Sequence, residues 1–181
     1  MPVTTVSRRF LRAAFAIATL PLLHASASAA AITVPDSLQT TATQTLALEA
    51  HAVGVQIYTC TAAKTAGGQP EWRLKAPEAT LYDAANTRLA THYAGPTWES
   101  TDGSKVVGKL KASATPSADA IPWLLLDVKS TQGNGVFSHI TAVQRLATEA
   151  GKAPADGCAA ASLGQEVRIP YQAVYRFYTT K

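Results

Sequence analysis

Residues 53–60 read VGVQIYTC, and this stretch decides the class of fold. Val53, Val55 and Ile57 point to one face of an extended chain, while Gln56 points to the other. A period of two residues is typical of a β-strand whose two faces meet different surroundings. The stretch therefore predicts a strand at the centre of the fold.

The same period recurs on both sides of this stretch. Residues 123–128 (WLLLDV) are apolar on both faces, which is typical of a central strand. Asp102-Gly103 favours a hairpin turn, because this pair tolerates the positive φ angles of tight hairpins. We expect about nine short strands, at residues 46–51, 53–60, 72–75 with 80–82 around Pro77, 88–94, 97–100, 105–112, 123–128, 136–146 and 171–179.

Helices are expected to be few and short. No segment shows a sustained helical stripe, and only residues 84–88 and 159–163 could form a single turn. Of the 181 residues, 47% are hydrophobic and 15% are charged, which excludes a disordered chain. Short strands between Gly, Pro and Asp turns favour an all-β domain, either an antiparallel β-sandwich or a small β-barrel.

The N-terminal residues are typical of a secretory signal peptide. Residues 1–12 carry three arginines and no acid, residues 13–23 are apolar, and residues 25–31 are rich in alanine. The apolar run is too short for a membrane helix. We expect removal of residues 1–29 and a secreted or periplasmic domain of residues 30–181. The paired arginines leave the general and the twin-arginine export routes open.

Export changes the meaning of the charge. The chain has 16 basic and 12 acidic residues, and losing the three arginines of the signal leaves 13 basic residues. Lys105, Lys109 and Lys111 form the only local basic group, whereas nucleic-acid binding requires a clustered basic face. We therefore expect no nucleic-acid partner, and no integral membrane protein after cleavage. The oligomeric state stays open.

The chain contains two cysteines, Cys60 and Cys158. In an oxidising compartment an isolated pair favours one disulfide, whereas in a reducing cytosol both would be small buried side chains. The chain has no C-x-x-C motif for redox chemistry, and a zinc site would need two further ligands. We expect a Cys60–Cys158 disulfide.

Several longer motifs carry a resemblance to a family. They are GVQIYTC at 54–60, APEATL at 76–81, HYAGPTWE at 92–99, AIPWLL at 120–125 and PYQAVYRFY at 170–178. Together they resemble the secreted bacterial and fungal family catalogued as domain of unknown function 3455, over about residues 34–178. The family name records no activity. Some fungal relatives carry a malate dehydrogenase label, but this chain lacks a G-x-G-x-x-G motif between a strand and a helix, so we expect no cofactor.

Residues with catalytic chemistry are scattered. His51, His92 and His139 lie on separate predicted strands, so the sequence does not assemble a metal site from them, and none is predicted. Glu99 and Asp102 could serve as paired carboxylates, and with His92 they give the alternative of an extracytoplasmic hydrolase. Charges beside a tight turn equally serve solubility. The chain has no G-x-S-x-G motif, and a non-enzymatic role is favoured.

Aromatic residues suggest a binding site instead. We expect residues 92–102 to line a groove for a small molecule or a carbohydrate, with His92, Trp98, Glu99 and Gln56 as ligand-binding residues. The alternative places Trp98 in the core. Strand alternation sends Trp98 and Glu99 to opposite faces, so they share a pocket only if a kink or a bulge breaks the alternation.

The function expected from the sequence is that of an exported protein that binds a small ligand or associates with the cell envelope.

Overall fold

A computed structural model describes residues 1, 31–65 and 67–181 of the chain. The chain divides into two units, Met1–Ala31 and Ile32–Lys181, and the second contains every strand described below. Residues 2–29 of the predicted signal peptide lie outside the described residues. Within the described part, no helix has the length and apolar character needed to cross a membrane.

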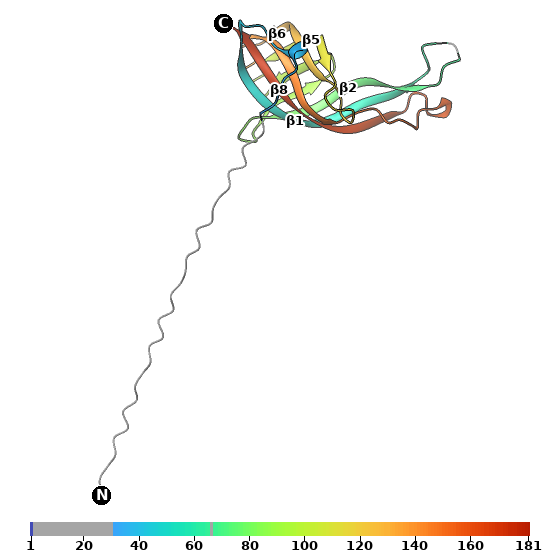
Figure 1. The fold of residues 1–181 in the computed structure, drawn as a ribbon, viewed down its shortest axis with the longest axis horizontal. Helices are drawn as coiled ribbons and strands as arrows, with labels where there is room; N and C mark the ends of the chain where they lie inside the picture. The colour runs from blue at the N-terminus through green and yellow to red at the C-terminus, as the bar shows by residue number, and fades with distance from the viewer. Residues whose placement is uncertain (2–30, 66) are drawn as a thin grey trace. The chain divides into compact units, whose positions relative to one another are not determined.

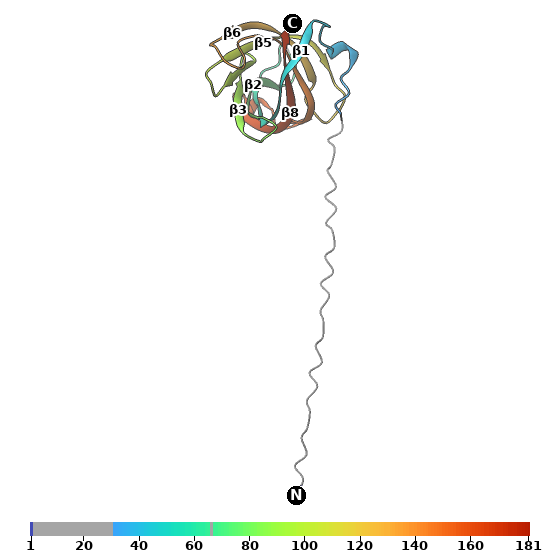
Figure 2. The ribbon, with the colours of Figure 1, turned by 90° about the vertical axis from the view of Figure 1, so that its left-hand side faces the viewer.

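The described strands form one closed antiparallel β-barrel (Figure 2). Each strand pairs with the next along the chain, and the last pairs with the first, so the ring has no free sheet edge along its paired parts. The expectation of an all-β fold is confirmed, with eight strands in the described residues. They are β1 (Gln44–Thr61), β2 (Glu71–Tyr82), β3 (Arg88–Tyr93), β4 (Thr97–Ser100), β5 (Lys105–Ala114), β6 (Trp123–Gln132), β7 (Ile140–Ala150) and β8 (Glu166–Thr180).

Several strands are longer than the sequence predicts, whereas β7 begins four residues later than the predicted strand at 136–146. The predicted strands at 46–51 and 53–60 are both parts of β1, because Ala52 stays extended and pairs with β2 and β8. Residues 72–82 likewise form one strand through Pro77. Proline is tolerated there because β3 pairs with β2 only from Ala79 onward, which leaves the other edge of β2 unpaired at Pro77.

Helical structure is limited to two short 3₁₀ turns, η1 (Asp36–Leu38) and η2 (Ala160–Ser162), in the residues that the structure describes. The second lies within the predicted turn at 159–163. Residues 84–87 form a tight turn instead, and Arg88 begins β3. The Asp83 carboxylate accepts hydrogen bonds from the backbone N–H groups of Ala85 (2.9 Å) and Thr87 (2.8 Å), which competes with a helical turn.

The barrel interior is packed with aromatic rings. Trp98, Phe137 and Phe177 are buried inside, with the Phe137 and Phe177 ring centroids 4.8 Å apart. Small side chains on the surrounding strands leave room for these rings. They include Ala50, Ala52, Ala79, Ala90 and Ala173, all of which are buried.

A second apolar cluster lies on the outer surface of the barrel. Leu38 of η1 packs there with Leu125 and Leu146. The Gln144 amide donates a hydrogen bond to the Leu38 carbonyl (2.6 Å) and accepts one from the Tyr178 hydroxyl (2.7 Å). The segment before β1 is therefore part of the domain.

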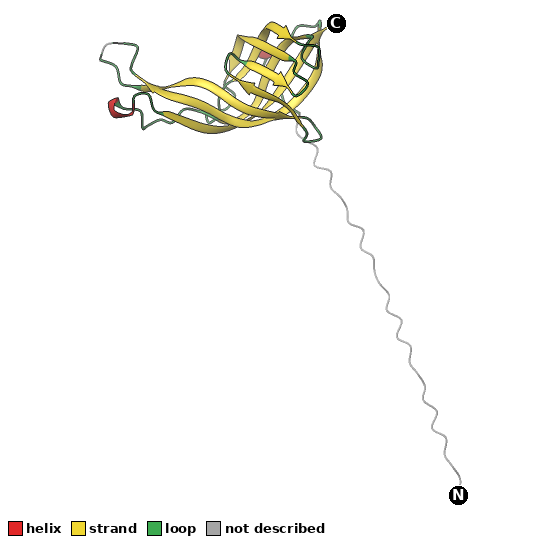
Figure 3. Cartoon of the chain, turned by 180° about the vertical axis from the view of Figure 1, so that it is seen from behind, coloured by secondary structure: helices red, strands yellow, loops and turns green. Residues whose placement is uncertain are grey.

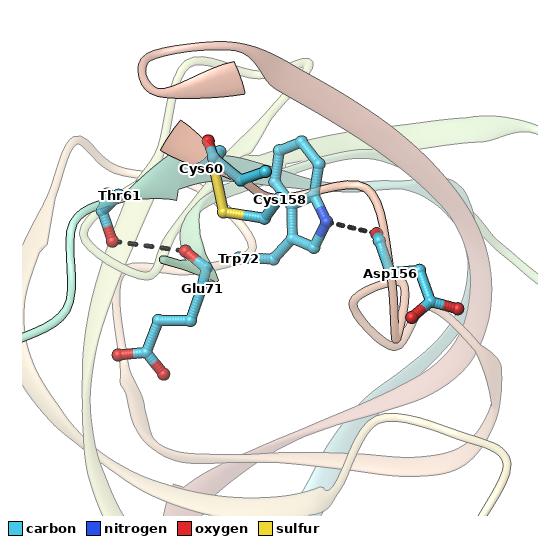
Figure 4. The surroundings of a disulfide bond; sticks show 7 residues. Cys60, Thr61, Glu71, Trp72, Asp156 and Cys158 are labelled. Carbon is cyan, nitrogen blue, oxygen red and sulfur yellow. Dashed lines mark hydrogen bonds between the residues drawn. A yellow bond between two sulfur atoms is a disulfide. The ribbon is translucent and has the colours of Figure 1, made fainter. Parts of the chain in front are cut away.

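Three strands continue beyond the barrel as a ribbon (Figures 1 and 3). We call this ribbon the arm; it comprises residues 57–61 of β1, 71–76 of β2 and 166–169 of β8. The predicted Cys60–Cys158 disulfide is confirmed, with 5.3 Å between the Cα atoms. Beside it the Trp72 indole N–H donates to the Asp156 carbonyl at 2.8 Å (Figure 4). Both links attach the loop before β8 to the arm.

Candidate functional site

A gap in the barrel wall arises from the shortness of β3 and β4. Strand β2 is 12 residues long and pairs with β3 only over Ala79–Tyr82, while β5 pairs with β4 only over Lys105–Val107. The unpaired ends of β2 and β5 are separated by the β3–β4 turn at residues 94–96. A cavity of about 420 Å³ opens here. It is lined by Gln56, Leu74, Lys75, Ala76, Pro77, His92, Ala94, Gly95, Pro96, Trp98, Leu110, Pro122, Leu124, Leu126, Arg145 and Tyr175.

The outer part of this cavity is apolar. Leu74 and Leu110 line it from β2 and β5, and both are 56% exposed, which is high for leucine in a folded domain. Pro77, Pro96 and Leu124 complete the same wall. A pocket of this volume, with mainly apolar walls and a few polar groups, has the usual character of a small-molecule site.

Two buried donors among the lining residues have no hydrogen-bond partner in the described residues. They are Nε2 of Gln56 and Nε1 of Trp98, and each of these residues is only 1% exposed. An unpartnered buried donor costs about 1–3 kcal/mol. Both residues line the cavity, and both were predicted from the sequence to bind a ligand. Trp98 is also part of the buried core, which was the alternative placement.

Arg145 of β7 supplies a positive charge at the same cavity. Its side chain is buried, and its Nε and Nη2 atoms donate to the Pro122 carbonyl at 3.1 and 2.8 Å. Among the described residues, no carboxylate oxygen lies within 4.0 Å of this guanidinium, and none of the lining residues is Asp or Glu. Arg145 is therefore a buried cation without an anionic neighbour in the described chain.

His92 lies deeper in the cavity as a neutral ring. Burial lowers its pKa to about 3, so the imidazole carries no charge near neutral pH. Its Nδ1–H donates to the Thr97 carbonyl at 2.8 Å, and the ring stacks on Trp98 with 4.4 Å between centroids. The imidazole is thus held between a backbone acceptor and an aromatic face.

The tyrosines around Arg145 are also neutral. Burial raises the pKa of Tyr175, and the positive charge of Arg145 only partly opposes this rise. Burial raises the pKa of Tyr58 and Tyr171 in the same way. The Tyr175 and Tyr171 hydroxyl oxygens are 3.3 Å apart, and the Tyr58 hydroxyl donates to the Gly151 carbonyl at 2.7 Å.

Glu99 lies outside the cavity. It is on the face of β4 opposite Trp98, because the strand alternates regularly after Pro96. Its carboxylate accepts a hydrogen bond from the Tyr93 hydroxyl (2.8 Å) and pairs with Lys105 (3.3 Å). The Tyr93 hydrogen bond, followed by Lys105, lowers the pKa of Glu99. The structure therefore brings Gln56, His92 and Trp98 together but not Glu99.

Asp102 lies in the β4–β5 turn, which follows the end of β4 that is remote from the cavity. Its carboxylate accepts hydrogen bonds from the Ser104 hydroxyl (2.6 Å), the Ser104 N–H (2.9 Å) and the Val136 N–H (2.9 Å). The Ser104 hydroxyl is the main cause that lowers the pKa of Asp102 to about 2. Asp102, Glu99 and His92 are thus in three different surroundings.

The remaining histidines lie on other parts of the barrel. His51 stacks on Tyr82 with 5.3 Å between ring centroids, and His139 is the last residue of the β6–β7 loop. Within the residues described, no three His, Cys, Asp or Glu side chains lie close enough together to hold a metal ion.

Arg145 and Tyr175 are lining residues that sequence reasoning missed. Residues 140–146 read ITAVQRL, so a single cation interrupts an otherwise largely apolar strand. An unpaired charge in such a strand is a signal that could have identified Arg145. The sequence does not show which charges lie near Arg145, because this depends on how β7 is aligned with its neighbours β6 and β8.

Comparison with known proteins identifies a family for this chain. Over residues 41–179 the chain matches the family described as "Protein of unknown function (DUF3455)". Neither the curated proteins nor the solved structures compared with it include a match. The match covers most of the chain, from β1 to the next-to-last residue of β8, in agreement with the resemblance carried by the sequence motifs. The chain belongs to this family of proteins of unknown function.

Proposed function

We propose that this protein binds a small molecule in the cavity between β2 and β5, and that it acts as a binding protein rather than as an enzyme. The observation that carries the proposal is the pair of buried donors of Gln56 and Trp98, which have no partner in the described residues and line a largely apolar cavity. A bound molecule with acceptor atoms would satisfy both donors and remove their energetic cost.

Binding is favoured over catalysis by the surroundings of the candidate catalytic groups. His92 is neutral, and its Nδ1–H is already donated to the Thr97 carbonyl. The carboxylates of Glu99 and Asp102 are held by hydrogen bonds away from the cavity. General acid–base catalysis requires such groups within hydrogen-bond reach of one reacting atom.

A neutral, polarity-sensitive dye tests the proposal directly. We expect Nile red to bind the purified protein saturably, with one dye per chain, and to gain fluorescence in the apolar cavity. Ala76→Trp adds an indole to the cavity wall and should weaken this binding at least about tenfold. Ala85→Trp, in the exposed β2–β3 turn, is the matched control and should leave binding unchanged.

Two results would overturn the binding proposal. One is the absence of saturable dye binding by the folded protein. The other is equal dye affinity in the unmodified protein and in a folded Ala76→Trp variant, because the dye would then bind elsewhere.

We also propose that the domain is exported before it binds its ligand. Two features support export: the three-part N-terminal sequence and the Cys60–Cys158 disulfide, which forms readily in oxidising compartments. Intact mass of the protein from a periplasmic or culture fraction should give an N-terminus within about two residues of Ala30. Recovery of the chain from membranes with Met1 still present would contradict export.

A further inference from the structure

Arg145 has no anionic partner in the described chain, although its side chain is only 9% exposed. The other cation at the cavity, Lys75, does have an anionic partner, because its Nζ atom lies 2.6 Å from the Glu166 carboxylate. Removing an arginine from water costs several kcal/mol unless an anion and hydrogen bonds compensate. Within the described residues, Arg145 has the Pro122 carbonyl as acceptor and the neutral Tyr175 hydroxyl beside it, and neither group carries a negative charge.

The neighbours of Arg145 cannot supply the missing negative charge. His92 is neutral, and burial keeps Tyr58, Tyr171 and Tyr175 in their protonated forms. The described neighbours of Arg145 therefore leave its positive charge without a compensating negative charge.

Among the described residues, the two buried lining atoms that have no hydrogen-bond partner are both donors. A guanidinium has five N–H donors and no acceptor, and two of those of Arg145 are directed at Pro122. Gln56 and Trp98 each add one buried N–H without a partner. A head group that fits this set must be rich in acceptors and preferably charged, and a carboxylate meets both requirements because it accepts two parallel bonds from arginine.

The rest of the cavity indicates the body of the ligand. Leu74, Leu110 and Leu124 form an apolar wall between the mouth and the polar residues. We infer that the ligand is an amphipathic monocarboxylate, whose carboxylate pairs with Arg145 and accepts hydrogen bonds from Gln56 and Trp98, and whose apolar body contacts the leucines at the mouth. This inference rests on the proposed binding function and specifies the ligand class.

Displacement of Nile red by matched compounds tests the head group. Decanoate, decanol and decylamine share a linear body, and 2-naphthoate and 2-naphthol share an aromatic one. Near neutral pH we expect at least one of the two acids to displace the dye at a concentration about tenfold below that of its alcohol. Decylamine should be the weakest of the linear set, because its charge repels Arg145.

Variants assign this preference to one residue. Arg145→Gln should make each acid and its alcohol equally effective. Arg145→Lys should retain part of the preference for the acid, because it keeps the charge but cannot donate two parallel hydrogen bonds to a carboxylate. Arg88→Gln removes an exposed arginine at the start of β3 and is the matched control, with the preference unchanged. If Arg145→Gln fails to fold, the order of displacement by the unmodified protein decides the question alone.

The outcomes separate this inference from the proposed function. Equal displacement by acids and alcohols would overturn the anionic head and would limit Arg145 to holding the Pro122 carbonyl, while binding itself stands. Preference for decylamine would overturn it as well. Failure of Nile red to bind saturably would overturn both proposals.

Discussion

The two ends of the barrel differ in how their polar groups are bonded. At the end near the β4–β5 turn, Asp102 accepts three hydrogen bonds, and the Ser104 hydroxyl also accepts one from the Phe137 N–H (3.2 Å). At the other end, Gln56 and Trp98 hold buried donors, and the described residues offer no partner to these donors and no carboxylate to Arg145. We call these the sealed end and the open end.

This difference distinguishes groups that serve the fold from groups that are available for binding. Asp102 joins two loops, and Phe137 beneath them is fully buried. A group whose bonds are complete gains little from a ligand, whereas an unsatisfied buried donor gains a partner. The comparison predicts that substitutions at the sealed end change stability and that substitutions at the open end change binding.

Loss of the disulfide should give the largest effect. The bond joins residues 98 positions apart, and loop-closure entropy gives an upper figure of about 4–5 kcal/mol of unfolding free energy. We expect Cys60→Ser to lose most of this in urea denaturation, and the double variant with Cys158→Ser to match it. Hydrogen exchange should rise in residues 151–165, the loop that the bond attaches to the arm, and stay unchanged at 133–139. Two free thiols in the exported protein would contradict the assignment.

Truncating a side chain should cost more unfolding free energy at the sealed end than at the open end. Phe137→Ala at the sealed end should cost about 3–5 kcal/mol of unfolding free energy, because a fully buried ring leaves a cavity. Leu124→Ala in the half-buried wall of the open end should cost only about 1 kcal/mol, because little packed surface is lost. Urea denaturation measures both. Equal losses would mean that the open end is packed as tightly as the sealed end.

His92 should make the open end sensitive to acid. Its pKa is about 3 in the folded chain and 6.5 as a free side chain, so between these values the unfolded chain binds more protons. Stability should therefore fall as the pH decreases through this range, by up to about 1.4 kcal/mol per pH unit. His92→Phe should remove this component of the pH dependence. The control His51→Phe, at an exposed position on β1, should retain it.

Asp102 should give a smaller effect at lower pH. Its pKa is about 2 in the folded chain and 3.8 as a free side chain, so its contribution is complete above about pH 4 and is lost as the pH falls towards 2. Asp102→Asn should reduce stability at neutral pH and flatten the decline between pH 4 and pH 2. Asp127→Asn, at an exposed position on β6, is the matched control. If the dependence of stability on acid pH is the same in Asp102→Asn as in the unmodified protein, the Asp102 carboxylate does not stabilise the sealed end.

Much of the fold followed from local patterns. The alternation of residues 53–60 predicts their strand, and Asp102-Gly103 predicts the turn between β4 and β5, where Gly103 has a φ of +83°. These features depend on neighbouring residues alone. The number of strands did not follow, because the sequence does not show that β1 continues through Ala52, where it pairs with β2 on one side and β8 on the other.

The candidate site was accessible to sequence reasoning only in part. Gln56, His92 and Trp98 were predicted and do line one cavity, whereas Glu99 lies on the outer face. The alternation rule already separates Trp98 from Glu99. Arg145 was missed because the sequence does not show that β7 turns this side chain towards β1 and β4 across the barrel.

The sequence by itself determined the all-β class and the placement of Trp98 and Glu99 on opposite faces of one strand, because both follow from local geometry. The two cysteines favoured a disulfide on the expectation of an oxidising compartment. The tertiary structure alone decided that the sheet closes into a barrel, that short β3 and β4 leave a gap beside longer neighbours, and that Arg145 faces Gln56 and Trp98 without an anion. These depend on register between strands distant in sequence, which is set by the packing of the whole interior.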